Sequence, residues 1–181
     1  AGACIAGVSL QSEATRMWWM ESLGWNIGDD SSTKVNNDKE RDTTELMKDY
    51  ALTISHISNL GLDVHFMVEN VEEFIDEYAM LEPEIMTFHI ETTKTEERTK
   101  NAIEEIKRAG SRVGISISPD TNLEEIKPYL ELVHMVLVMT VVPGKGGQKL
   151  IPETLEKVKE LKEYIDKNNI KKFLHTLSYP L

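Results

Sequence analysis

The chain has 181 residues, of which 40% are hydrophobic and 28% are charged. This length suits one domain with a hydrophobic core. The formal net charge of −11 argues against a nucleic-acid partner, because phosphate recognition needs a cluster of Lys and Arg. The single cysteine, Cys4, cannot form an internal disulfide, and neither a signal peptide nor a membrane-spanning apolar run is recognisable. We therefore expect one soluble, cytoplasmic domain over residues 1–181, without a membrane partner.

The two ends of the chain carry weak structural signals. Residues 4–9 are a candidate first strand, followed by a candidate helix at 17–23, and residues 25–27 look like part of a second strand. Residues 28–42 are polar and charged without apolar periodicity, so irregular chain is predicted there. Irregular chain with a weak strand at best is also predicted over 171–181.

From residue 60 onward, short apolar segments alternate with helical patterns. Four segments of strand length are rich in Val, Ile, Phe or Thr, at residues 62–68, 85–91, 112–118 and 135–142. Their continuous apolar character is typical of parallel strands that are buried on both faces. Together with the two N-terminal segments at 4–9 and 25–27, they give six candidate strands.

Helical patterns occupy the intervals, at residues 71–81, 95–109 and 121–133 and after Pro152. The pattern at 121–133 begins with capping-box spacing and contains Pro128, which can kink a helix. Strands that alternate with helices over short loops predict parallel pairing and hence an α/β protein. A closed eight-fold barrel and an open doubly wound sheet both fit this alternation.

Three segments resemble the ribulose-phosphate 3-epimerase family. They are LDVHFMVEN at 62–70, TFHIE at 87–91 and VLVMTVVPGKGGQKLIPETLEKV at 136–158. They are similar to the family's third strand, its fourth strand, and its sixth strand with the following phosphate loop. Their order and spacing also agree with the family. The resemblance implies a TIM-type (β/α) barrel, of which about six of eight strand–helix units are recognisable.

The resemblance implies an isomerase of carbohydrate metabolism, in the pentose phosphate pathway, that interconverts ribulose 5-phosphate and xylulose 5-phosphate. Proton abstraction next to a carbonyl and reprotonation from the opposite face require two acid/base groups. The resemblance also implies a divalent metal ion (Fe, Zn, Mn or Co) that stabilises the developing oxyanion, and a homo-oligomer. The phosphate of the substrate positions the reacting carbon.

Three side chains on the matching strands are candidate site residues. His65 matches a metal-binding histidine of the family and is expected to contact the substrate; the alternative is a hydrogen-bonded structural histidine. Met67 and Met139 match methionines that lie against the planar intermediate, where a thioether excludes water without competing for the metal. Their alternative is a place in the hydrophobic core. His89 is predicted to be a structural histidine at a strand end.

The glycine-rich loop resembles the family's phosphate cradle, in which backbone N–H groups approach an anion closely. Its predicted substrate-binding residues are Gly144, Lys145, Gly146 and Gly147. The family usually has an aromatic residue at the position of Lys145. Ser9 is the candidate for a substrate-binding serine of the first strand, after a one-residue shift from the ungapped alignment.

Two parts of the family pattern are not matched. The family's second strand carries His-x-Asp followed by Met-Asp-Gly, whereas residues 25–34 read WNIGDDSSTK and leave Asp29 as the candidate catalytic carboxylate or an exposed loop residue. The seventh-strand Asp-Gly-Gly is not found in residues 171–181. The alternatives are therefore a 3-epimerase of a hexulose 6-phosphate such as allulose 6-phosphate, and a catalytically impaired phosphosugar-binding remnant. A decarboxylase-related phosphate-binding barrel fits the motifs less well.

Overall fold

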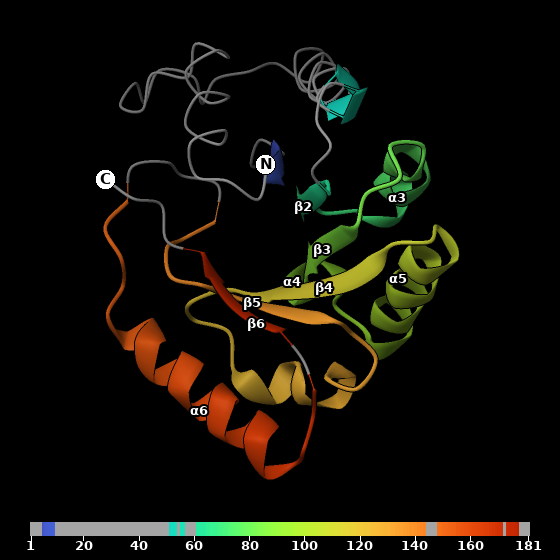
Figure 1. Cartoon of the computed structure of the whole chain (residues 1–181). Coiled ribbons are helices and arrows are strands. Elements are labelled where there is room, and N and C mark those ends of the chain that lie inside the picture. The colour runs from blue at the N-terminus through green and yellow to red at the C-terminus, as the bar shows by residue number, and fades with distance from the viewer. Residues whose placement is uncertain are drawn as a thin grey trace.

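The computed structural model describes residues 5–9, 51–53, 55–56, 61–143, 148–171 and 173–177. The strands in these ranges form one six-stranded sheet whose spatial order follows the chain (Figure 1). They are β1 (Ile5–Ser9), β2 (Asp63–Met67), β3 (Ile85–His89), β4 (Arg112–Ile117), β5 (Met135–Met139) and β6 (Phe173–Leu177). A sheet wound in one direction with helices between its strands is the arrangement of a barrel rather than of a doubly wound sheet.

The predicted parallel pairing is confirmed from β2 to β6, since each of these strands runs parallel to the next. β1 is an exception and corrects the expectation of parallel strands throughout. It pairs antiparallel with β2, with Ile5 opposite Met67 and Ser9 opposite Asp63. An antiparallel strand satisfies the backbone groups along the edge of β2 as well as a parallel one does. The expected second strand at 25–27 and the irregular segment at 28–42 lie outside the described residues.

β6 corrects the prediction of irregular chain over 171–181. Residues 173–177 form a strand that pairs with all five residues of β5, from Met135 opposite Phe173 to Met139 opposite Leu177. The free edge of the buried strand β5 supplies the hydrogen-bond partners that make this segment a strand. Local sequence carries no information about that edge, so the strand signal in this segment is weak.

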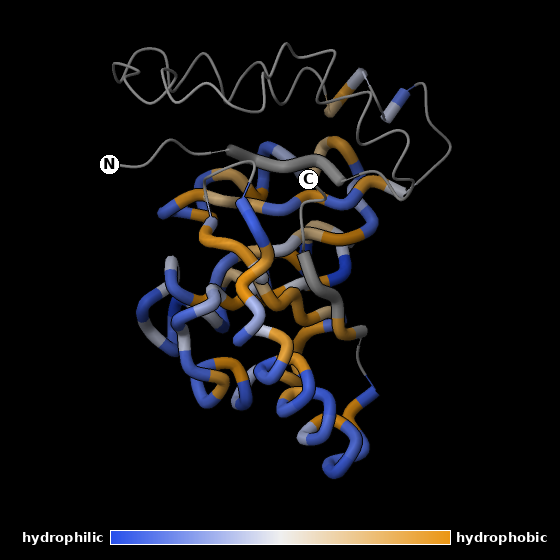
Figure 2. The backbone as a smooth tube through the Cα atoms, turned by 90° about the vertical axis from the view of Figure 1, so that its left-hand side faces the viewer, coloured by the Kyte–Doolittle hydropathy of each residue, from blue (hydrophilic) through white to orange (hydrophobic). Residues whose placement is uncertain are grey.

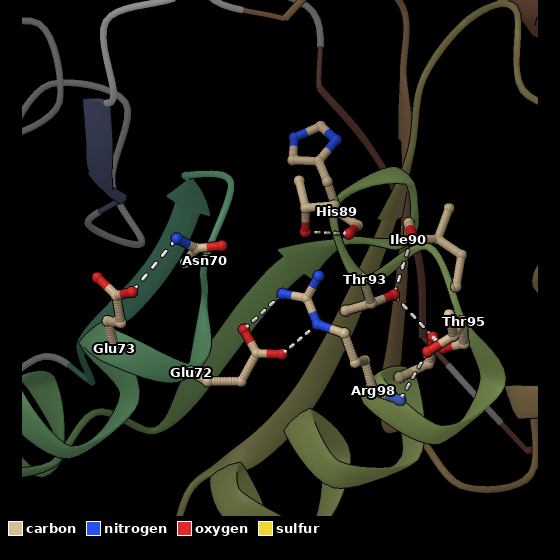
Figure 3. Close-up of polar contacts among 10 residues, drawn as sticks. Asn70, Glu72, Glu73, His89, Ile90, Thr93, Thr95 and Arg98 are labelled. Atoms are coloured by element: carbon tan, nitrogen blue, oxygen red, sulfur yellow. Dashed lines mark hydrogen bonds and ion pairs between the residues drawn. The ribbon is translucent and has the colours of Figure 1, made fainter.

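The longer helices lie on one side of the curved row of strands (Figure 1). They are α3 (Glu72–Ala79), α5 (Glu96–Arg108) and α6 (Glu153–Lys167), and the single turn α4 (Ile90–Thr93) follows β3 directly. The side chain of Thr95 caps α5 by accepting a hydrogen bond from the N–H of Arg98 at 3.2 Å. Arg98 also binds Glu72 of α3 through two hydrogen bonds of 2.9 and 3.0 Å (Figure 3). No helix within the described ranges is long and apolar enough to cross a membrane.

The segment expected to form one helix over 121–133 instead forms two short 3-10 helices. These are η2 (Leu123–Glu125) and η3 (Lys127–Tyr129), and Asn122 caps the first of them through its side chain. Pro128 lacks the N–H that a continuous α-helix requires at this position, and its ring crowds the preceding turn. The apolar positions of the predicted pattern are nevertheless buried.

Alternate residues of the strands face two different environments. One set packs against the helices and forms the main core: Val64, Phe66, Met86, Phe88, Val113, Ile115, Ile117, Val136 and Val138. The other set faces the opposite side, which we call the inner face. There Met135, Leu137, Met139 and Val141 form a second cluster, against which Met67 and Ile85 pack. Hydrophobic chain accordingly gathers at the centre of the described part, with hydrophilic segments outside it (Figure 2). This is a section of a TIM-type barrel.

Gly114 on β4 allows close packing on the inner face. It lies opposite Thr87 in the register of β3 and β4. A Cβ at this position would lie 2.2 Å from Thr87 Oγ1 and 3.0 Å from Thr87 Cβ, closer than van der Waals contact permits. Thr87 is fully buried, and its hydroxyl has no hydrogen-bond partner among the described residues. A larger residue at 114 therefore has to displace a buried side chain or the backbone.

We expect Gly114→Ala to lower the free energy of unfolding by about 1–3 kcal/mol, because the added methyl overpacks the inner face. Urea denaturation of the whole chain, followed by circular dichroism, measures this. The matched control is Gly61→Ala, whose Cβ meets the flexible end of Glu84 at 2.1 Å and should cost less than about 0.5 kcal/mol. Adding Thr87→Ala should recover most of the loss at Gly114. Equal effects at the two glycines would contradict the packing argument.

Candidate functional site

His65 lies on the inner face at the centre of β2 and contacts a second histidine. Its side chain is buried, and its Nε2 lies 3.0 Å from Nε2 of His89, the last residue of β3. The two rings stack with centroids 5.0 Å apart and planes at 19°. The hydroxyl of Ser116 on β4 lies 3.5 Å from the same nitrogen of His65. The ring of His89 points away from the Arg98–Glu72 ion pair (Figure 3). Three neighbouring strands thus bring polar side chains together in the barrel interior.

Glu91 extends this group beyond the end of β3. It lies in the first turn of α4, and its Oε2 is 3.3 Å from Nδ1 of His89. Its other oxygen, Oε1, accepts a hydrogen bond of 2.7 Å from the backbone N–H of Ser118, just after β4. Both carboxylate oxygens are therefore engaged by donors from two different strand ends.

Burial and hydrogen bonding set the charges in this group. Burial by itself raises the pKa of Glu91, but hydrogen bonds from His89, Thr121 and the Ser118 N–H outweigh it and lower the pKa to about 2. Burial lowers the pKa of His65 to about 3, and positive charge on His89 acts in the same direction. At neutral pH the site consequently holds an ionised carboxylate and a neutral His65.

Lys157 fixes the loop that holds Glu91. From α6, its ammonium group donates to the backbone carbonyls of Ser118 at 3.1 Å, Pro119 at 2.6 Å and Thr121 at 2.6 Å. Burial lowers the pKa of Lys157, and nearby carboxylates including Glu91 oppose that shift. Three charge-assisted bonds from one side chain tie the loop after β4 to the helix that follows β5.

The two predicted methionines lie in one apolar cluster. Met139 of β5 is fully buried, and Met67 at the end of β2 is half-buried and packs against the cluster that contains Met139. The structure therefore brings together side chains that are 72 residues apart in the sequence, by the difference of their numbers. Their contact with a substrate stays a prediction.

Of the other predicted site residues, Ser9 lies within the described part of the chain. Ser9 lies in β1 with its backbone opposite Asp63. Asp29 and the glycine-rich loop (Gly144, Lys145, Gly146 and Gly147) lie outside the described residues. The chain on either side of this loop is held together, since the side chain of Gln148 donates to the carbonyl of Val142 at 2.6 Å and accepts from its N–H at 3.2 Å.

The contact between His65 and His89 was not found from the sequence. His89 was expected at a strand end, where it lies, but its partner and the roles of Glu91 and Ser116 were missed. A signal was present: both histidines occupy inward positions of neighbouring strands, and Glu91 follows His89 by two residues. Which inward positions meet depends on the register between strands, and the sequence pattern does not give it.

The described residues do not by themselves fit the expected divalent metal ion. Across the described ranges, no three His, Cys, Asp or Glu side chains are arranged to hold a metal. The Nε2 of His65, the expected metal ligand, is already engaged by His89. A metal centre needs three or four such donors, so further ligands would have to come from other parts of the chain or from another chain.

The low pKa of Glu91 predicts a loss of stability in acid. Folding lowers this pKa from 4.5 to about 2, so its stabilisation is complete above pH 4.5 and disappears as the pH falls toward 2. We expect Glu91→Gln to lower the free energy of unfolding at neutral pH by on the order of 1–3 kcal/mol, and this difference from the wild type to shrink in acid. Urea denaturation at several pH values measures it. Glu97→Gln, at an exposed position, is the control, and a pH-independent effect of Glu91→Gln would contradict the assignment.

Comparison with known proteins identifies the family. The sequence model of the ribulose-phosphate 3 epimerase family matches residues 45–176. A ribulose-phosphate 3-epimerase of Helicobacter pylori is 41% identical over 116 residues, which are 64% of this chain and 52% of that protein. The cytoplasmic isoform of ribulose-phosphate 3-epimerase from Oryza sativa is 42% identical over 105 residues, which are 56% of this chain and 45% of that protein. The ribulose-phosphate 3-epimerase of Escherichia coli is 32% identical over 121 residues, which are 65% of this chain and 52% of that protein. The chain spans about half the length of these curated relatives. It belongs to the ribulose-phosphate 3-epimerase family.

Proposed function

We propose that this chain interconverts ribulose 5-phosphate and xylulose 5-phosphate as part of the pentose phosphate pathway. The family match over residues 45–176 carries this proposal, supported by relatives named ribulose-phosphate 3-epimerase. The proposed site of action is the cytoplasm, in keeping with the name of the rice relative. We further propose a homo-oligomer and no nucleic-acid partner, the latter because the net charge is −11.

The inner face is the proposed place of reaction. His65 is neutral and buried there, so it offers a nitrogen lone pair to a substrate hydroxyl in surroundings from which water is largely excluded. Met67 and Met139 supply an apolar wall suited to a planar ene-diolate. The glycine-rich loop at 144–147 is the proposed holder of the phosphate, and the Gln148–Val142 hydrogen bonds support its ends.

Epimerisation needs one proton acceptor and one proton donor on opposite faces of the reacting carbon. Asp29 is the proposed carboxylate for one face, and the other face needs a second acid/base group. A divalent metal ion (Fe, Zn, Mn or Co) belongs to the same proposal and would require ligands in addition to His65. The substrate is proposed as a pentulose phosphate, with a hexulose 6-phosphate such as allulose 6-phosphate as the comparison compound.

The proposal is tested by incubating the whole chain with ribulose 5-phosphate and each of the four metal ions. Formation of xylulose 5-phosphate and incorporation of solvent deuterium at carbon 3 are followed together. We expect His65→Gln to lower the rate by on the order of 10²-fold or more, because it removes a substrate-contacting imidazole. His56→Gln is the matched control, since His56 is exposed.

Saturable binding of ribulose 5-phosphate without deuterium exchange, by chain shown to be folded, would contradict an epimerase and favour a phosphosugar-binding protein. Faster turnover of allulose 6-phosphate than of ribulose 5-phosphate would overturn the pentulose assignment alone. An equal effect of the His65 and His56 variants would show that the inner face is not the reaction site.

A further inference from the structure

We propose that Glu91 and His89 are positioning residues that hold His65 in the tautomer with its proton on Nε2, which leaves Nδ1 as the nitrogen that accepts a hydrogen bond. The inference deepens the proposed function, on which the catalytic relevance of His65 rests. The tautomer itself is a property of the folded chain and is measurable whether or not the chain turns over a substrate.

The charge of Glu91 decides which atoms donate and which accept in this series of contacts. An ionised carboxylate has no proton to give and can only accept. One oxygen of Glu91 accepts from the N–H of Ser118 at 2.7 Å, and the other lies 3.3 Å from Nδ1 of His89. His89 must therefore donate from Nδ1 to make this bond.

The same reasoning determines which nitrogen of His65 carries the proton. In the neutral form of His89, the nitrogen that does not donate carries the lone pair, so Nε2 of His89 is then an acceptor. This atom lies 3.0 Å from Nε2 of His65, and two lone pairs cannot face each other at that distance. His65 must then donate from Nε2, and the oxygen of Ser116 at 3.5 Å can share this N–H. The lone pair of His65 is left on Nδ1.

We call the contacts from Glu91 through His89 to His65 the relay. These residues are held rigidly enough to fix the directions of the hydrogen bonds between them. Both histidines are buried, with 7% of His65 and 5% of His89 exposed, so water does not compete for their nitrogens. The loop that supplies the Ser118 N–H is anchored by the three carbonyl contacts of Lys157. The orientation of His65 is consequently decided by a carboxylate that does not touch it.

Glu91→Gln tests the relay because an amide has one accepting and one donating end. The shorter and better bond is the one from the Ser118 N–H, so the amide oxygen should stay there. The NH₂ group then faces Nδ1 of His89 and turns it into an acceptor. His89 must now donate from Nε2, and His65 must accept there, which moves the proton of His65 to Nδ1. Glu91→Gln is a near-isosteric change at a position 26 residues after His65 (91 minus 65). It should nevertheless move the proton of His65 to the other ring nitrogen.

The experiment is ¹⁵N NMR of the whole chain labelled at histidine, at about pH 8, where a histidine with an ordinary pKa is neutral. Long-range ¹H–¹⁵N correlations distinguish a protonated from an unprotonated ring nitrogen, and the signals of His65 and His89 are assigned from His65→Gln and His89→Gln. We expect Nε2–H for His65 in the wild type and Nδ1–H in Glu91→Gln. Glu72→Gln is the control, since it removes a partly buried carboxylate whose partner, Arg98, lies outside the relay. It should leave the wild-type tautomer unchanged.

A wild-type His65 protonated on Nδ1 would overturn the inference, and this measurement does not depend on any variant folding. An unchanged tautomer in folded Glu91→Gln would also overturn it. If the chain is active, Glu91→Gln should lower kcat roughly 10- to 100-fold, as loss of a supporting hydrogen bond typically does, and Glu72→Gln should not. If the chain is inactive in every variant while the tautomers behave as expected, the proposed function fails and the positioning role stands.

Discussion

Parallel pairing from β2 to β6 is the constraint on which the other features depend. It places the ends of successive strands at the same edge of the sheet, so that β3 and β4 deliver His89 and the Ser118 N–H to one place. It also gives each strand two faces with a period of two residues. The apolar set buries itself against α3, α5 and α6, and the remaining set turns inward. The hydrogen-bond partners of a polar side chain on the inner face therefore come mainly from a neighbouring strand, as His89 does for His65.

The inner face contains both satisfied and unsatisfied polar groups. His65, His89, Glu91 and the Ser118 N–H form a continuous series of contacts, which offsets the cost of burying them. The hydroxyl of Thr87 has no hydrogen-bond partner among the described residues, and Gly114 leaves the space that this side chain fills. Departures from the packing rules of this kind are expected at functional or strained sites.

The residues that show the family are not the same as the acid/base groups that the proposed epimerisation needs. The match covers the strands that carry His65, Met67 and Met139, and it extends along α6 to β6. The described residues contribute one expected metal ligand and a carboxylate that supports a histidine. The proposed epimerisation requires two acid/base groups, so it would need residues beyond His65 and Glu91.

The sequence by itself determined the α/β class, the four central strands and the amphipathic helices, because continuous apolar runs and helical periodicity are local properties. The resemblance in three motifs added the barrel and picked out His65, Met67 and Met139 as candidates. Tertiary structure decided the rest. The edge of β5 turned residues 173–177 into a strand, and β1 paired antiparallel. The contact between His65 and His89 likewise depends on strand register, which arises from packing between distant segments and is not encoded in any one of them.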